Sequence, residues 1–150
     1  QKGNIIEGTA SAGIGHLSSI SDDGLTVLSV GRTANSGITS TVVYELINNV
    51  WTKKGDPILL KGGKSILNGD GNELAIKFNP DNTNYESIVS FRWDGTRWNQ
   101  LGSEISLNYA NNTISYMIKN SLAHFEYENG NWVIAVGSGV GIKLMYKRNK

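Results

Sequence analysis

The sequence predicts an all-β protein built from repeated units. Three observations support this prediction. Apolar residues mostly alternate with polar ones instead of recurring every three or four positions. The chain has 18 glycines and only 2 prolines, spread along its length. Three segments of one pattern each end on a tryptophan. With 150 residues, the chain is long enough for one domain with its own core.

Turn residues and alternation place the expected strands in order along the chain. Clusters of Asn, Asp and Gly recur about every 8–12 residues, a spacing typical of sandwiches, barrels and propellers. Strands are expected at residues 14–21, 25–31, 39–47, 50–54, 64–68, 73–78, 86–93, 97–101, 104–108, 113–118, 121–127, 131–136 and 140–147.

Each tryptophan segment is predicted to be one hairpin. The segments read Tyr44-Glu-Leu-Ile-Asn-Asn-Val-Trp51, Phe91-Arg-Trp-Asp-Gly-Thr-Arg-Trp98 and Phe125-Glu-Tyr-Glu-Asn-Gly-Asn-Trp132. Their Asn-Asn, Asp-Gly and Asn-Gly pairs tolerate the positive φ that tight turns require. Because the tryptophans occupy the same place in every segment, we expect them to pack where units meet, in preference to stacking on sugar rings.

Two further motifs define the unit. Glycine and isoleucine follow the tryptophan at +4 and +7 in two copies, as Gly55 with Ile58 and as Gly102 with Ile105, whereas the third copy has Val136 in place of the glycine. Upstream, an Asp-Gly turn lies between two strands. Its copies are Asp23-Gly24, Asp70-Gly71 and, more faintly, Asn111-Asn112. A unit therefore has four strands, which predicts a β-propeller, or a fragment of one with about three blades.

We expect one domain spanning residues 1–150, with units at about 7–58, 59–105 and 106–137. Gln1-Lys-Gly3-Asn-Ile-Ile6 matches Gln100-Leu-Gly102-Ser-Glu-Ile105, so residues 138–150 and 1–6 are expected to share a further blade, within one chain or between chains. The numbering is expected to start inside a longer precursor. A β-trefoil is the alternative fold, although the tryptophan spacings of 47 and 34 residues between Trp51, Trp98 and Trp132 are unequal.

The motifs resemble the tandem propeller-type repeats of large surface proteins of marine bacteria and of proteins of large DNA viruses of algae and protists. Ser21-Asp-Asp-Gly24, Val42-Val-Tyr44-Glu45 and Trp98-Asn-Gln-Leu-Gly102-Ser-Glu-Ile105 carry the resemblance, which covers nearly the whole chain. It implies a non-enzymatic structural or adhesive protein of a cell surface, an extracellular assembly or a virion.

Composition argues against several function classes. Fourteen basic and 13 acidic residues give a net charge of +1, so nucleic acid is not an expected partner. No apolar run approaches the roughly 20 residues of a membrane helix, so membrane insertion is not expected. The chain has no cysteine, which excludes disulfides, thiolate zinc sites and thiol catalysis.

No catalytic or metal motif is discernible. His16 and His124 belong to no metal-ligand pattern, and no serine, histidine and carboxylate set is evident, so we expect neither an enzyme nor a cofactor. The stretches 68–73 and 79–86 alternate oxygen-bearing side chains, as calcium loops do. Because both lack a full acidic set, we favour Asx turns.

The predicted function is that of a structural or adhesive repeat module that associates with itself or with neighbouring repeats of a longer chain. The alternative is a glycan-binding lectin of propeller or trefoil type. A residue that the repeat does not require is freer to bind a ligand. The candidates on this basis are Tyr85, Trp93, Arg92 and Arg97.

Overall fold

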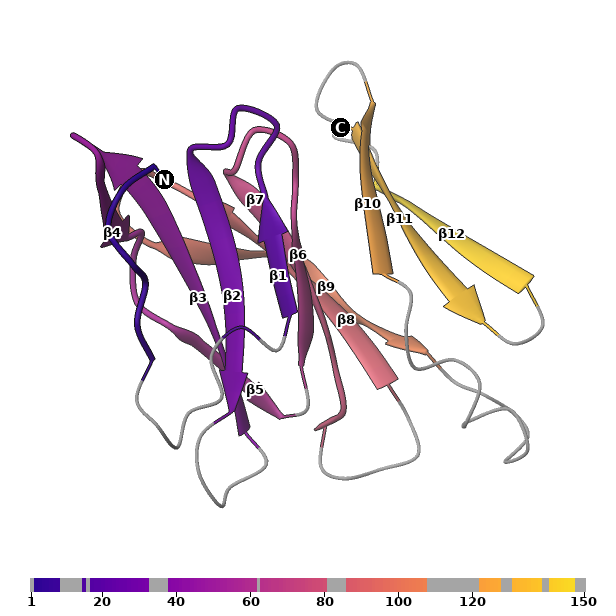
Figure 1. Ribbon diagram of the computed structural model, residues 1–150. Helices are drawn as coiled ribbons and strands as arrows, with labels where there is room; N and C mark the ends of the chain where they lie inside the picture. The colour runs from indigo at the N-terminus through magenta and orange to yellow at the C-terminus, as the bar shows by residue number, and fades with distance from the viewer. Residues whose placement is uncertain are drawn as a thin grey trace.

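The computed structural model describes residues 2–8, 15, 17–32, 38–61, 63–80, 86–107, 122–127, 131–138 and 141–147. Within these ranges, side chains are described up to Ile105, except those of Leu17 and Glu86. The described residues form β-strands, turns and loops, with no α-helix (Figure 1). The all-β prediction is therefore confirmed.

The strands form three antiparallel sheets, and from here on each sheet is called a unit. Residues 58–61 then belong to the first unit and residues 141–147 to the third, beyond the expected ends at 58 and 137. The first unit contains β1 (Leu17–Ile20), β2 (Thr26–Arg32), β3 (Ile38–Ile47), β4 (Val50–Lys53) and β5 (Ile58–Lys61), in the order β1-β2-β3-β4 with β5 also paired to β3. The second unit contains β6 (Lys64–Leu67), β7 (Glu73–Phe78), β8 (Glu86–Trp93) and β9 (Trp98–Leu107), in that order. The third contains β10 (Leu122–Tyr127), β11 (Asn131–Ser138) and β12 (Gly141–Lys147). The described strands do not close into a barrel.

The first two units have the same strand register, 47 residues apart. Val27 lies opposite Tyr44 in the first unit, and Leu74 lies opposite Phe91 in the second. The tryptophan hairpins also match, because Leu46 pairs with Trp51 as Trp93 pairs with Trp98. The internal repeat inferred from the sequence is thus a structural repeat across these two units.

The glycine at +4 allows a two-residue bulge in the strand that carries the tryptophan. In the first unit Lys53 pairs with Tyr44 and Ile58 with Thr41, so five steps along one strand match three along the other. In the second unit Leu101 and Ile105 pair with Ser90 and Ile88, which leaves the same excess of two. The bulge glycines, Gly55 and Gly102, have φ of 81° and 66°, a region that glycine enters at little cost.

Several predicted strands differ from those observed. Strand β5 was not predicted, and the strands expected at 97–101 and 104–108 are one strand, β9, because the bulge bends the strand without ending it. The strand expected at 113–118 lies outside the described residues. The predicted third hairpin is confirmed as β10–β11, but Trp132 pairs with Glu126, one residue away from the partner that the other two units use.

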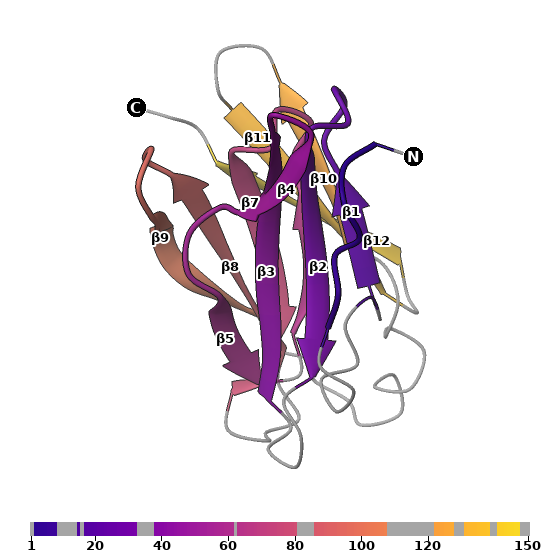
Figure 2. The ribbon, with the colours of Figure 1, turned by 60° about the vertical axis from the view of Figure 1, so that its left-hand side comes forward.

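The first two sheets stack face to face around one apolar core. Leu28, Val30 and Val43 project from one side of the first sheet, which we call its back face. They pack against a side of the second sheet that we call its front face, formed by Leu67, Leu74, Ile76 and Val89 with Phe91 at its margin. Two views show the sheets side by side, with the β10–β12 sheet beyond them (Figures 1 and 2). In that third sheet, β10 lies beside β6.

Candidate functional site

The three proposed ligand residues that the structure describes each have a different main neighbour. Trp93 is half-buried and lies against Trp98, with ring centroids 5.5 Å apart and planes tilted by 51°. Arg92 lies on the face of β8 opposite to Trp93, and its Nε–H donates to Glu73 Oε1 at 2.6 Å. Arg97 is exposed, and its Nε lies 3.7 Å from Asp94 Oδ2. Tyr85 lies outside the described residues.

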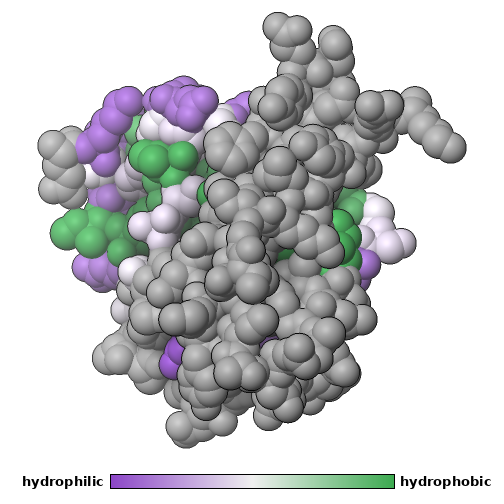
Figure 3. All heavy atoms as spheres, turned by 90° about the vertical axis from the view of Figure 1, so that its right-hand side faces the viewer, coloured by the Kyte–Doolittle hydropathy of each residue, from purple (hydrophilic) through white to green (hydrophobic). Residues whose placement is uncertain are grey.

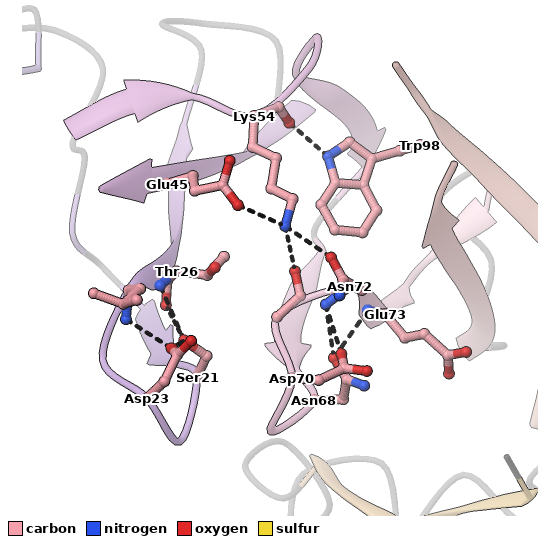
Figure 4. Close-up of polar contacts among 12 residues, drawn as sticks. Ser21, Asp23, Thr26, Glu45, Lys54, Asn68, Asp70, Asn72, Glu73 and Trp98 are labelled. Carbon is pink, nitrogen blue, oxygen red and sulfur yellow. Dashed lines mark hydrogen bonds and ion pairs between the residues drawn. The ribbon is translucent and has the colours of Figure 1, made fainter. Parts of the chain in front are cut away.

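Trp93 and Trp98 instead form the junction between the first two units. A Cβ built on Gly55 would lie 2.6 Å from the Trp93 ring and 3.2 Å from that of Trp98. The Trp98 indole N–H donates to the carbonyl of Lys54 at 2.7 Å, across the same junction (Figure 4). The tryptophan of one unit therefore packs onto the bulge glycine of the preceding unit, and only glycine leaves room for it.

The same kind of contact recurs where residues 2–4 meet the first unit. A Cβ built on Gly3 would lie 2.7 Å from the Trp51 indole and 2.8 Å from Leu46. The Trp51 indole N–H donates to the carbonyl of Lys2 at 3.2 Å. Gly3 has φ of 76°, close to the 81° of Gly55. Residues 2–4 thus contact the first unit in the way that residues 54 and 55 contact the second.

Lys54 is the charged centre of the junction. Its side chain is 4% exposed, and its Nζ lies 3.4 Å from Glu45 Oε1 in the first unit. The same Nζ donates to the Gly71 carbonyl at 3.1 Å and to Asn72 Oδ1 at 2.9 Å in the second unit. It also lies 5.9 Å from the centroid of the Trp93 ring, within range of a cation–π contact. A buried ammonium needs such partners, and here they come from both units.

The Lys54 site was not identified from the sequence. A lysine stands immediately before the bulge glycine at both junctions, as Lys2-Gly3 and Lys54-Gly55, and this dipeptide is the signal that could have revealed it. Its counterpart before Gly102 is Leu101, so the pattern does not extend to every copy. Its partners could not have been found this way, because backbone carbonyls accept irrespective of residue type.

Three further polar contacts join the first two units. The Asp22 backbone N–H donates to the Gly69 carbonyl at 2.8 Å, which joins the two Asp-Gly turns. The Leu67 N–H donates to Ser19 Oγ at 3.2 Å. The hydroxyls of Thr41 and Ser65 lie 2.6 Å apart. The junction therefore combines apolar packing with the buried Lys54 ammonium and these hydrogen bonds.

The remaining repeat residues occupy the expected strands. Tyr44 is buried, and burial raises the pKa of its phenol above the ordinary value. Phe91 and Trp98 are partly buried against the core. For Phe125 and Trp132 the structure describes the backbone alone, in β10 and β11. The turn at 68–73 contains the predicted Asx turn, in which Asp70 Oδ1 accepts from the Asn72 N–H at 2.8 Å. Asn68 Oδ1 also accepts from the N–H groups of Asn72 and Glu73.

The described residues offer neither a metal-binding cluster nor a membrane-spanning helix. They contain no group of three or more His, Cys, Asp or Glu side chains placed to hold a metal ion. None of their segments forms a helix of the length and hydrophobicity needed to cross a bilayer. In Figure 3 the described residues at the margins of the view present both apolar and polar surface.

Comparison with known proteins gives no relative for this chain: no protein-family model, no curated protein and no solved structure matches it.

Proposed function

We propose that this chain is a non-enzymatic structural repeat module whose four-stranded units stack as the blades of a propeller-type array, and that it serves a cell surface, an extracellular assembly or a virion. The observation that supports this best is the repeated junction. Trp51 on Gly3 and Trp98 on Gly55 make the same contact, each with the indole N–H donating to the preceding lysine carbonyl.

The direction of stacking supports an array. The front face of the second unit corresponds, 47 residues earlier, to positions 20, 27, 29, 42 and 44 of the first. These positions lie on the side of the first sheet opposite to Leu28 and Val43. Units therefore stack front to back, a heterologous contact that generates rings or open arrays, whereas a two-fold sandwich would bury equivalent faces.

The buried polar groups are used for structure. Lys54 joins two units, while Ser21 and Asn68 each hold a turn through their side-chain oxygens. The carboxylate of Glu73 pairs with Arg92 across neighbouring strands. Trp93, one of the predicted ligand residues, packs against Trp98 and Gly55. These assignments favour the structural proposal over the lectin.

Substitution of the junction glycine tests the stacking. In Gly55→Ala the new methyl group meets the Trp93 ring and the backbone is held at positive φ, so we expect a loss of about 2–3 kcal/mol in the free energy of unfolding. Gly24→Ala is the matched control, because Gly24 has φ of 69° and its Cβ would meet nothing within 4 Å. We expect it to lose about 1 kcal/mol. Equal losses in denaturant unfolding would contradict the proposed junction.

Labelling of intact material tests the biological role. An antibody raised against the 150-residue chain should label the unpermeabilised cells, matrix or particles that carry the protein. An antibody against a cytosolic protein of the same material provides the control for integrity. Labelling that requires permeabilisation would exclude the surface and virion role, whatever the outcome for the junction.

A further inference from the structure

The first unit holds residues 2–4 through two hydrogen bonds that add to the repeated junction contact. The Gly3 N–H donates to Asn49 Oδ1 at 3.1 Å. The Trp51 backbone N–H donates to Asn4 Oδ1 at 2.7 Å. A further hydrogen bond runs from the Trp51 indole N–H to the carbonyl of the residue before Gly3. One hairpin therefore binds three consecutive residues through backbone and side-chain groups.

The corresponding segment of the second junction is held by its own sheet. Lys54 and Gly55 lie between β4 and β5, which both pair with β3. The Lys54 N–H also donates to the Val43 carbonyl at 2.8 Å. Residues 2–8, by contrast, form no strand. Residues 2–4 are therefore held by the surface that they contact, as a bound peptide is, and not by strand pairing of their own.

The contacts of residues 2–4 define which segment fits. A Cβ at position 3 would lie 2.7 Å from the Trp51 indole and 2.8 Å from Leu46, and φ there is 76°, so this position requires glycine. The next residue gives a side-chain oxygen to the Trp51 N–H, which suits asparagine. The residue before the glycine is recognised through its backbone carbonyl, which every residue type offers.

We propose that Leu46, Asn49 and Trp51 form a binding site, the hairpin site, for a short peptide segment of the type x-Gly-Asn, and that a separate peptide can occupy it in place of residues 2–4. The inference rests on the proposed function, because the hairpin site belongs to one of its two junctions. Hydrogen bonds to the backbone of a segment, combined with selection of one side chain, are typical of peptide recognition.

The hairpin site is preorganised by the strands that carry it. Leu46 in β3 pairs with Trp51 in β4, and Asn49 closes the turn between them with φ of 63°. A site that is already formed loses little conformational entropy when a peptide binds. Removal of residues 2–4 from it should therefore leave a surface that still recognises the same segment.

An NMR titration of the isotope-labelled 150-residue chain with a peptide of residues 1–8 tests the proposal. The chain carries Gly3→Val, because a branched side chain at positive φ, against the Trp51 indole, should release residues 2–4 and leave the hairpin site intact. We expect saturable shifts of the Trp51 indole N–H signal. The parent chain should bind the peptide at least about twofold more weakly, because its own segment competes at an effective concentration of about millimolar.

The chain and the peptide both offer matched controls. The Trp98 indole N–H makes the equivalent hydrogen bond at the other junction, so its signal should stay unchanged. The same peptide with Gly3→Ala should bind at least about tenfold more weakly, because its Cβ would meet the indole and its φ would be strained. In the chain, Asn4→Ala removes one hydrogen bond without crowding the site, so its affinity for the peptide should lie between those of Gly3→Val and the parent.

Two outcomes would overturn the inference: a Trp51 signal in Gly3→Val that does not respond to about 10 mM peptide, or an equal response to the alanine peptide. Dispersed amide signals show that the variant is folded, and Asn4→Ala decides by the same criteria if it is not. The result is separable from the Gly55→Ala comparison, which concerns the other junction. Absence of peptide binding with unequal losses in Gly55→Ala and Gly24→Ala removes only this inference, whereas equal losses there remove the proposed function itself.

Discussion

The first and second units have the same turn after their first strands, β1 and β6, but build it from different residues. Ser21 Oγ accepts from the N–H of Thr26 at 2.9 Å, and Asn68 Oδ1 accepts from the N–H of Glu73 at 2.8 Å. Both side chains are buried, at 3% exposure. The comparison teaches that this position requires a short side chain with an acceptor oxygen, and that hydroxyl and amide serve equally.

The same turns agree where their geometry leaves no choice. Asp23 and Asp70 each accept a backbone N–H two residues on, both at 2.8 Å. Gly24 and Gly71 follow, with φ of 69° and 73°. A left-handed backbone selects glycine, and an Asx turn selects aspartate or asparagine. These positions repeat in the sequence because backbone conformation constrains them.

The two hairpins have the same number of residues between equivalent strand positions but differ in how many of these residues are unpaired. The first closes with two residues, Asn48 and Asn49, at φ of 50° and 63°, as a tight turn requires. The second uses four, from Asp94 to Arg97, and one carboxylate organises them. The hydrogen bonds that Asp94 accepts, first from Arg97 N–H and then from the Thr96 hydroxyl and N–H, hold its pKa far below the ordinary value.

Removal of the Lys54 side chain should give the largest difference between the two junctions, the one at Gly55 and the one at Gly3. In Lys54→Ala the Gly71 carbonyl and Asn72 Oδ1 lose a buried donor, so we expect about 2–3 kcal/mol less stability; Glu45 adds little because it is 42% exposed. Lys2→Ala, before the other bulge glycine, should cost less than about 0.5 kcal/mol because Lys2 is exposed. Denaturant unfolding measures both. Similar losses would show that burial of the lysine does not matter.

The equivalent turn glycines should differ by a smaller amount. A Cβ on Gly71 would lie 2.6 Å from Thr26 Oγ1 in the first unit, whereas one on Gly24 would meet nothing within 4 Å. Both have positive φ, so each alanine variant carries the same strain of about 1 kcal/mol. We expect Gly71→Ala to lose about 1 kcal/mol more than Gly24→Ala in thermal unfolding. No difference would mean that Thr26 moves aside and the turns are not packed together.

The smallest effect concerns the Asp94 turn. Because folding lowers the pKa of the Asp94 carboxyl group, the stabilisation that the charged carboxylate contributes is present above the ordinary pKa of 3.8 and is lost as pH falls towards the lower folded value. Thr96→Val removes the hydroxyl that donates to Asp94 at 2.7 Å, so its pKa should rise towards the ordinary value. An NMR titration of the carboxyl group measures this. Thr52→Val, whose hydroxyl instead faces the Val50 carbonyl at 3.4 Å, should leave the Asp94 titration unchanged.

Sequence reasoning predicted the strands and hairpins of the first two units because their turns are local. Positive φ at Asn48, Asn49, Gly55 and Gly102 follows from residue types that tolerate it. Strand β5 was missed because its pairing with β3 depends on a bulge three residues before it begins. The hairpin register of the third unit, with Trp132 opposite Glu126, could not be read from the tryptophan spacing alone.

The sequence by itself determined the all-β class, the 47-residue repeat between the first two units and the glycines that their turns and bulges need. These features depend on alternation and on backbone conformation, which act over a few residues. Only the tertiary structure decided that Trp93 packs at a junction, that Lys54 is buried between two units, and that Ile20 is exposed where Leu67 is covered. Those outcomes depend on which face of one sheet meets the next, a long-range choice that identical local patterns leave open.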